Sequence, residues 1–209
     1  MTDVPQLIYV HDPMCSWCWG FRPAFERLCA QLPAQIQVRW LLGGLARDSD
    51  EPMPSEMQAR LQETWRCIQQ RIPGTRFNFA FWHECQPRRS TWPACRAVIA
   101  ARSLDASLQG PMVLAIQHAY YLEARNPSDA DTLIALAEQL GLPGGRFARL
   151  LERPDTQAAL LAEIARARQL GAGSFPSLRL QTGRGHWPVP VDYTDADAML
   201  ATIQTLLEP

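Results

Sequence analysis

Two cysteines at Cys-x-x-Cys spacing, Cys15 and Cys18, constrain this chain more than any other feature. The apolar run before them, residues 6–11, is typical of a β-strand. After them, apolar residues recur every three or four positions as far as Leu32, which is the pattern of an amphipathic helix. The sequence therefore places the cysteine pair where a strand passes into a helix, with Cys15 at or just before the first helical turn.

The position of Cys15 has a chemical consequence. The first backbone N–H groups of a helix have no partner inside the helix, and the helix dipole adds positive potential there. This environment favours the thiolate, which is the attacking species in thiol–disulfide exchange. Cys18 lies one turn further along, on the apolar face of the helix. We therefore predict that Cys15 is an exposed nucleophile and that Cys18 is the resolving thiol.

Two alternatives compete with a redox role for the cysteine pair. Zinc usually takes four ligands, and the other closely spaced set, His83, Cys85 and Cys95, lies on a distant segment. Unreactive core thiols are also common, which would suit Cys18 but not a cysteine at a helix start. A redox pair without a metal is therefore the preferred interpretation. Whether Cys85 and Cys95 form a second redox pair stays open, because geometry decides a disulfide.

Composition narrows the class of protein. The chain has 209 residues, of which 47% are hydrophobic and 20% charged, an ordinary composition for a globular protein. Its net charge of −1 gives no reason to expect nucleic acid or an anionic membrane as a partner. No run of about 18 apolar residues predicts a membrane-spanning helix. The first residues do not resemble a secretory signal, so we expect a cytoplasmic protein.

Hydrophobic periodicity predicts the order of the elements. Strands are expected at 6–11, 35–42, 177–181 and 186–191, the last at a sheet edge because it contains two prolines. Helices are expected at 15–32, at 55–72, from residue 91 to about 108, at 110–126, 128–141 and 154–170, and from about 195. Residues 75–90 are expected to form a loop. Its aromatic side chains either pack the helices onto the sheet, which is the preferred interpretation, or line a substrate groove.

Three side chains near the cysteines carry weaker expectations. His11 should end the first strand with its ring hydrogen-bonded, although either His11 or Asp12 could move a proton for Cys15. Trp19 points away from the apolar stripe and belongs either to a substrate-binding rim or to an exposed surface. Ser90 or Thr91 should cap the helix that follows.

The segment around the cysteines resembles the active site of the DsbA-like thioredoxin superfamily, and most closely its FrnE-like branch of predicted disulfide oxidoreductases. The motif that carries the resemblance is Tyr9-x-x-Asp12-Pro13-Met14-Cys15-Ser16-Trp17-Cys18-Trp19-Gly20-Phe21-x-Pro23. The segment 173–178 resembles the Gly-x-Pro segment that closes the site in that family, and 90–97 and 119–121 resemble parts of its helical insert. The resemblance spans nearly the whole chain.

The resemblance implies an α/β protein with a thioredoxin fold (β-α-β, then β-β-α) interrupted by an all-helical insertion. Residues 1–47 and 172–209 would form the thioredoxin-like domain, and 48–171 the insertion domain. Pro176 would be a cis-proline that faces the cysteines, and Phe175 would offer its backbone to a substrate. The dipeptide between the cysteines lacks the Pro or His of better known relatives, so their redox potential cannot be transferred.

The implied activity is that of a thiol–disulfide oxidoreductase, of protein disulfide isomerase or DsbA type, acting on a disulfide-containing protein or a small thiol. It would need no cofactor beyond its dithiol, with glutathione as a candidate co-substrate. The alternative is a glutathione-dependent transferase or isomerase of the kappa-type or 2-hydroxychromene-2-carboxylate isomerase-like group, in which serine typically replaces the first cysteine. A thiol sensor without turnover is a third hypothesis. The oligomeric state is left open.

Overall fold

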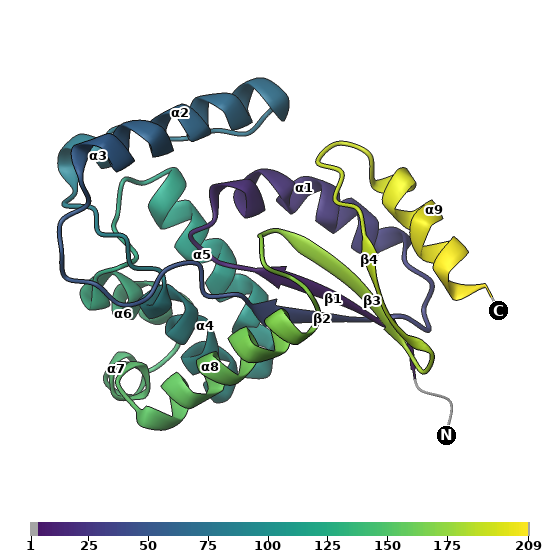
Figure 1. Ribbon diagram of the computed structural model, residues 1–209. Coiled ribbons are helices and arrows are strands. Elements are labelled where there is room, and N and C mark those ends of the chain that lie inside the picture. The colour runs from purple at the N-terminus through teal and green to yellow at the C-terminus, as the bar shows by residue number, and fades with distance from the viewer. Residues whose placement is uncertain (1–3, 209) are drawn as a thin grey trace.

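The computed structural model describes residues 4–208, and its centre is a four-stranded sheet in the order β2-β1-β3-β4 (Figure 1). The strands are β1 Gln6–His11, β2 Gln37–Leu42, β3 Ser177–Thr182 and β4 Gly185–Val189. β1 runs parallel to β2 and antiparallel to β3, and β3 is antiparallel to β4. β4 therefore lies at a sheet edge, as the sequence predicts, and Pro188 falls within the strand while Pro190 follows it.

Alternation along β1 divides the core into two layers. Leu7 and Tyr9 face the layer built with α1 (Ser16–Gln31) and α9 (Ala196–Leu207), which lie side by side over one face of the sheet (Figure 1). Ile8 and Val10 face the opposite layer, where the end of α8 (Pro154–Gln169) covers the sheet. Both faces of β1 are therefore buried.

The helical insertion lies in the chain between β2 and β3, and most of it lies beyond the end of the sheet at which β1 and β2 finish (Figure 1). Its helices are α2 Ser55–Arg71, α3 Phe81–Glu84, α4 Trp92–Leu104, α5 Gln109–Tyr121, α6 Ala130–Gln139, α7 Gly144–Leu151 and α8. This element order confirms the thioredoxin fold with a helical insertion. The division into two domains at residues 47 and 172 stays a prediction.

Two expected boundaries are wrong. The segment 75–90 contains the single helical turn α3, which is too short to show a hydrophobic period. The helix expected to reach residue 108 ends at Leu104, because Asp105 adopts an extended conformation. The Asp105 side chain accepts a hydrogen bond from the backbone of Ser107 and starts a separate 3-10 turn, Ala106–Leu108. A local side-chain bond therefore interrupts an apolar pattern that continues in the sequence.

The aromatic side chains of 75–90 pack within the insertion. The Trp65 ring lies 4.8 Å from Phe77, 5.6 Å from Phe79 and 4.9 Å from Trp82 between ring centroids. Trp65 is fully buried. These rings thus form the core of the helical insertion around Trp65, whereas the sequence indicated that they join the helices to the sheet. Among the described helices, none combines the length and the apolar character needed to cross a lipid bilayer.

Candidate active site

The first turn of α1 holds Cys15 at the N-cap position, as its sequence position predicts. The Cys15 N–H donates to the Asp12 carbonyl at 3.0 Å, and the Cys15 carbonyl accepts from the Trp19 N–H at 3.1 Å. The side-chain carboxylate of Asp12 also accepts from the Met14 N–H at 2.8 Å. These bonds fix the turn between β1 and α1, so the Cys15 side chain leaves the helix at its positive end.

The Cys15 sulfur is more covered than a nucleophile exposed to solvent should be. Cys15 is 6% exposed and Cys18 is fully buried, so the expected order holds while the expected exposure of Cys15 is wrong. One cause is a long-range contact, in which the Cys15 Sγ donates to the Phe175 carbonyl at 3.4 Å. The loop before β3 therefore lies against the sulfur, which the spacing of the cysteines could not indicate.

The peptide bond between Phe175 and Pro176 is cis, as predicted. Residue 176 directly precedes β3, and the Phe175 ring packs against Gly43 at the end of β2. A Cβ atom at Gly43 would lie 2.1 Å from two carbon atoms of the Phe175 ring. The absence of a side chain at Gly43 thus makes room for the ring whose carbonyl contacts Cys15.

Cys18 lies in an environment that keeps it protonated. Burial raises the pKa of the Cys18 thiol well above its ordinary value, and a hydrogen bond with Cys15 raises it further. Burial likewise raises the pKa of the Tyr9 phenol, to which the charges of both cysteines and a hydrogen bond with Cys18 add. Tyr9 and Cys18 therefore form a buried, uncharged pair beneath Cys15.

Asp12 is a fully buried carboxylate that binds four donors. Besides the Met14 N–H, it accepts from the Leu45 N–H at 2.7 Å, from the Thr91 hydroxyl at 2.7 Å and from the Cys95 thiol at 3.5 Å. Burial raises the pKa of the Asp12 carboxyl, and these hydrogen bonds oppose the rise. The active-site turn is thereby joined to the segment after β2 and to α4.

His11 ends β1 as expected, but its ring is not hydrogen-bonded. His11 is fully buried, and neither ring nitrogen has a partner in the described structure. The ring stacks on Tyr9 at 4.9 Å and meets Trp40 edge-on at 5.1 Å. Burial lowers the pKa of His11 to about 3, with smaller contributions from Arg22 and Arg102. His11 is therefore a neutral core residue at ordinary pH.

The tryptophans near the cysteines have different surroundings. Trp17 is half-buried, lies 5.2 Å from Tyr193 and has the Arg71 guanidinium 6.0 Å from its ring. Trp19 stacks at 5.8 Å on Tyr121, and its indole N–H donates to the Arg76 carbonyl at 3.1 Å. Trp19 therefore joins α1 to the insertion, and neither of the two roles expected for it describes this contact.

All six cysteines are free thiols. Cys85 donates to the Ala124 carbonyl at 3.0 Å, whereas Cys95 donates to Asp12, so the two thiols have separate partners. Across residues 4–208, no group of three or more His, Cys, Asp or Glu side chains is arranged to hold a metal ion.

Sequence reasoning missed three functional contacts. These are the four donors on Asp12, the hydrogen bond of 2.9 Å from the buried Trp65 indole to Ser16, and the space at Gly43 for Phe175. Apart from the Met14 bond to Asp12, each joins residues more than 30 positions apart. The sequence features that mark these positions are a Gly-Gly pair after β2 and an Asp-Pro pair after β1.

A Cys-x-x-Cys pair at the start of α1 that faces a cis-proline loop, on a sheet of this topology, defines the class of DsbA-like thioredoxin-fold proteins. The chain belongs to this family, since the model described as the DSBA-like thioredoxin domain matches residues 6–187.

Solved structures of similar proteins cover nearly the whole chain. A protein of Nitrosomonas europaea, provisionally assigned as a protein disulfide isomerase, is 29% identical with a TM-score of 0.84, and the match covers 97% of each chain. The cytosolic disulfide reductase DsbM of Pseudomonas aeruginosa is 26% identical with a TM-score of 0.77, covering 97% of this chain and 98% of that one. DsbM has also been solved with GSH.

Curated relatives are more distant. The ClpXP adapter protein SpxH of Halalkalibacterium halodurans is 24% identical over 177 residues, which are 79% of this chain and 55% of SpxH. The chain thus spans little more than half the length of the curated relatives that it matches.

Proposed function

We propose that this chain is a thiol–disulfide oxidoreductase in which Cys15 is the nucleophile and Cys18 the resolving thiol. The observation that carries the proposal is the placement of Cys15 at the N-cap of α1, beside the Phe175 carbonyl and above the buried Cys18. The Cys15 side chain lies at the positive end of the α1 dipole, whereas burial raises the pKa of the Cys18 thiol and keeps it protonated.

The reaction would proceed in two exchanges. The Cys15 thiolate attacks one sulfur of a substrate disulfide, forms a mixed disulfide and releases the other sulfur as a thiolate, which takes a proton. Cys18 then loses its proton and attacks the Cys15 sulfur, which releases the second substrate thiol and leaves a Cys15–Cys18 disulfide. The substrate gains two electrons, and the enzyme dithiol supplies them.

Phe175 and Pro176 are proposed to contact the substrate. Because the Phe175 carbonyl lies 3.4 Å from the attacking sulfur, an extended substrate segment that binds this backbone would bring its own disulfide to Cys15. Trp17, half-buried beside the cysteines, would form part of the same surface.

We propose the reductive direction and glutathione as the thiol that restores the dithiol. Support comes from the similarity to a cytosolic disulfide reductase that has been solved with GSH. A cytoplasmic location belongs to the same proposal, since the cytosolic thiol pool favours reduction. Isomerase activity would require the same Cys15 attack, without the need for net electron transfer.

Insulin reduction with glutathione as the electron source tests the proposal. Cys15→Ser should abolish turnover, because no nucleophile remains. Cys18→Ser should stop turnover but accumulate a mixed disulfide at Cys15, visible on a non-reducing gel. Cys67→Ser is the matched control, since the half-buried Cys67 lies in α2 with no role in the exchange. Turnover by Cys15→Ser would refute the assignment.

The same variants also test two other functions. Conjugation of glutathione to chlorodinitrobenzene that survives Cys15→Ser would identify the glutathione transferase alternative. The SpxH similarity favours a second candidate, a protease adapter that binds a client protein. Delivery of a client to a protease by both wild type and Cys15→Ser, without insulin reduction by wild type, would identify that role.

A further inference from the structure

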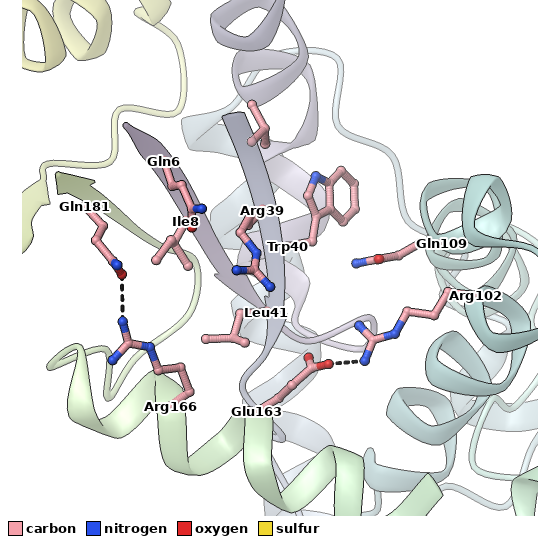
Figure 2. Close-up of a pocket in the computed structure, with 11 residues that line it drawn as sticks. Gln6, Ile8, Arg39, Trp40, Leu41, Arg102, Gln109, Glu163, Arg166 and Gln181 are labelled. Atoms are coloured by element: carbon pink, nitrogen blue, oxygen red, sulfur yellow. Dashed lines mark hydrogen bonds and ion pairs between the residues drawn. The ribbon is translucent and has the colours of Figure 1, made fainter. Parts of the chain in front are cut away.

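A cavity of about 550 Å³ lies away from the cysteines, on the face of the sheet that α8 covers and at the β2 edge (Figure 2). Its walls come from β1, β2 and β3 and from α4, α5 and α8. Cys15, Cys18, Phe175 and Pro176 do not line it. Its volume is within the range of pockets that bind small molecules.

The charge in this cavity is strongly positive. Arg39 of β2, Arg102 of α4 and Arg166 of α8 line it together with one carboxylate, Glu163. The other lining side chains carry no formal charge. Three guanidinium groups against one carboxylate leave a local surplus of two positive charges, in a chain whose net charge is −1.

Two of the three arginines are held by neighbours. Arg102 forms an ion pair with Glu163, and both side chains are largely buried. The other oxygen of Glu163 accepts from the Leu42 N–H at 2.7 Å, which fixes the pair against the end of β2. Arg166 donates to the Gln181 side chain at 2.6 Å. Because a guanidinium has five N–H donors, both groups keep free donors after these bonds.

Arg39 differs from the other two arginines. Figure 2 shows its guanidinium between Arg166 and the Arg102–Glu163 pair, with no bond to any of the residues drawn. Repulsion between neighbouring guanidinium groups is relieved by an anion that contacts more than one of them. The free Arg39 is therefore the group that a ligand in this cavity would engage first.

The backbone of β2 adds donors to the same cavity. The Gln37 N–H bonds to the Pro5 carbonyl and the Gly43 N–H to the His11 carbonyl, so odd-numbered residues of β2 face β1. Hydrogen-bonding direction alternates along a strand, and the N–H groups of the even-numbered residues therefore face the open edge. Residues 38 and 40 both line the cavity.

We propose that this cavity binds a small organic dianion, with Arg39 and Arg166 as its principal ligands. The planar fork of arginine matches the oxygen atoms of a phosphate monoester or a dicarboxylate. The buried Ile8 and the half-buried Leu41, which pack on the same face of the sheet, would contact the carbon part of the ligand. The site is separate from the proposed redox centre and does not depend on its activity.

Calorimetric titration with inorganic phosphate, glycerol phosphate and succinate tests the proposal, with acetate as the monoanion. At least one dianion should bind wild type, and acetate should bind much more weakly. Arg39→Gln and Arg166→Gln should each weaken binding by about tenfold or more, since each removes charge-assisted hydrogen bonds. Binding by the phosphates alone, or by succinate alone, identifies the oxyanion.

The matched control is Arg168→Gln, which removes an exposed charge from the same helix outside the cavity. Its affinity should equal that of wild type, and Cys15→Ser should also bind normally. The proposal is overturned if no dianion binds wild type, if Arg39→Gln and Arg166→Gln bind as wild type does, or if Arg168→Gln weakens binding equally. Melting temperatures of all variants show that the fold is retained.

Discussion

At the scale of single residues, the site contains buried groups whose ionisation the fold opposes. Burial raises the pKa values of Cys18 and Tyr9 and lowers that of His11. All three groups are therefore held in their neutral forms, and burial is the largest cause in each case. A cluster of this kind leaves Cys15 as the sulfur able to begin the exchange in the proposed reaction. It also makes stability sensitive to pH, because the unfolded chain ionises where the folded chain does not.

His11 should cause a loss of stability in acid. Its pKa is about 3 when folded and 6.5 in its ordinary state, so only the unfolded chain gains a proton as the pH falls through 6.5. Between about pH 7.5 and about pH 5, this loss amounts to roughly 2 kcal/mol. His11→Phe should remove that part of the pH dependence in urea denaturation. His83→Gln, at an exposed histidine, should retain it, and equal pH dependence in wild type and His11→Phe would contradict the argument.

At the scale of elements, the ends of helices and strands position the site. The Asp195 side chain accepts from the Ala198 N–H at 2.9 Å and caps α9, as the sequence indicates. The expected Thr91 cap of α4 does not form, because the Thr91 hydroxyl binds Asp12 and Ala46 instead. The same residue type can thus serve its own helix or a distant carboxylate, and only tertiary contacts decide between them.

Removal of the α9 cap should destabilise the protein without affecting the site. Asp195→Ala leaves the Ala198 N–H unpaired, which costs about 1 kcal/mol and lowers the melting temperature by about 2–4 °C. Asp195→Asn keeps an acceptor and should melt close to wild type. Insulin reduction at moderate temperature should be equal in all three proteins. A melting temperature of Asp195→Ala equal to that of wild type would show that the cap contributes nothing.

Gly43 at the end of β2 should be needed for the position of the Phe175 loop. In Gly43→Ala the new methyl group would overlap the Phe175 ring, so the ring and its carbonyl must move away from Cys15. We expect insulin reduction to fall by about tenfold or more. Gly110→Ala is the control, because a Cβ there would meet nothing within 4 Å beyond its chain neighbours and its own helix backbone. Full activity of Gly43→Ala would mean that the loop tolerates the shift.

At the scale of the whole molecule, the order of strands and helices was predictable and the contacts between them were not. Strand and helix periods, together with the motif around Cys15, indicate the fold and the cis-proline loop. Contacts such as Trp65 with Ser16 depend on how the insertion packs against α1. No local sequence pattern indicates that packing. For the same reason, the sequence predicts neither the burial of Cys15 nor the absence of a hydrogen-bond partner for the His11 ring.

The Thr91–Asp12 hydrogen bond joins the insertion to the active-site turn, so its loss should lower the stability of the folded protein. Thr91→Val keeps the shape but removes the hydroxyl, at a cost of about 1–3 kcal/mol. The loss should be larger at neutral pH than in acid, because the charged carboxylate needs its donors most. Chemical denaturation at both pH values measures this, with Thr91→Ser as the variant that keeps the hydroxyl. A stability of Thr91→Val equal to that of Thr91→Ser would refute the role.

The carboxylate of Asp12 also limits which helical insertions can be exchanged between proteins of this family. Its four donors come from the turn itself, from the segment after β2 and from α4. A chimaera that receives a foreign helical insertion would keep the acid but lose two of these partners. Transplanting the insertion therefore requires grafting a matching hydroxyl and thiol, or exchanging the acid as well.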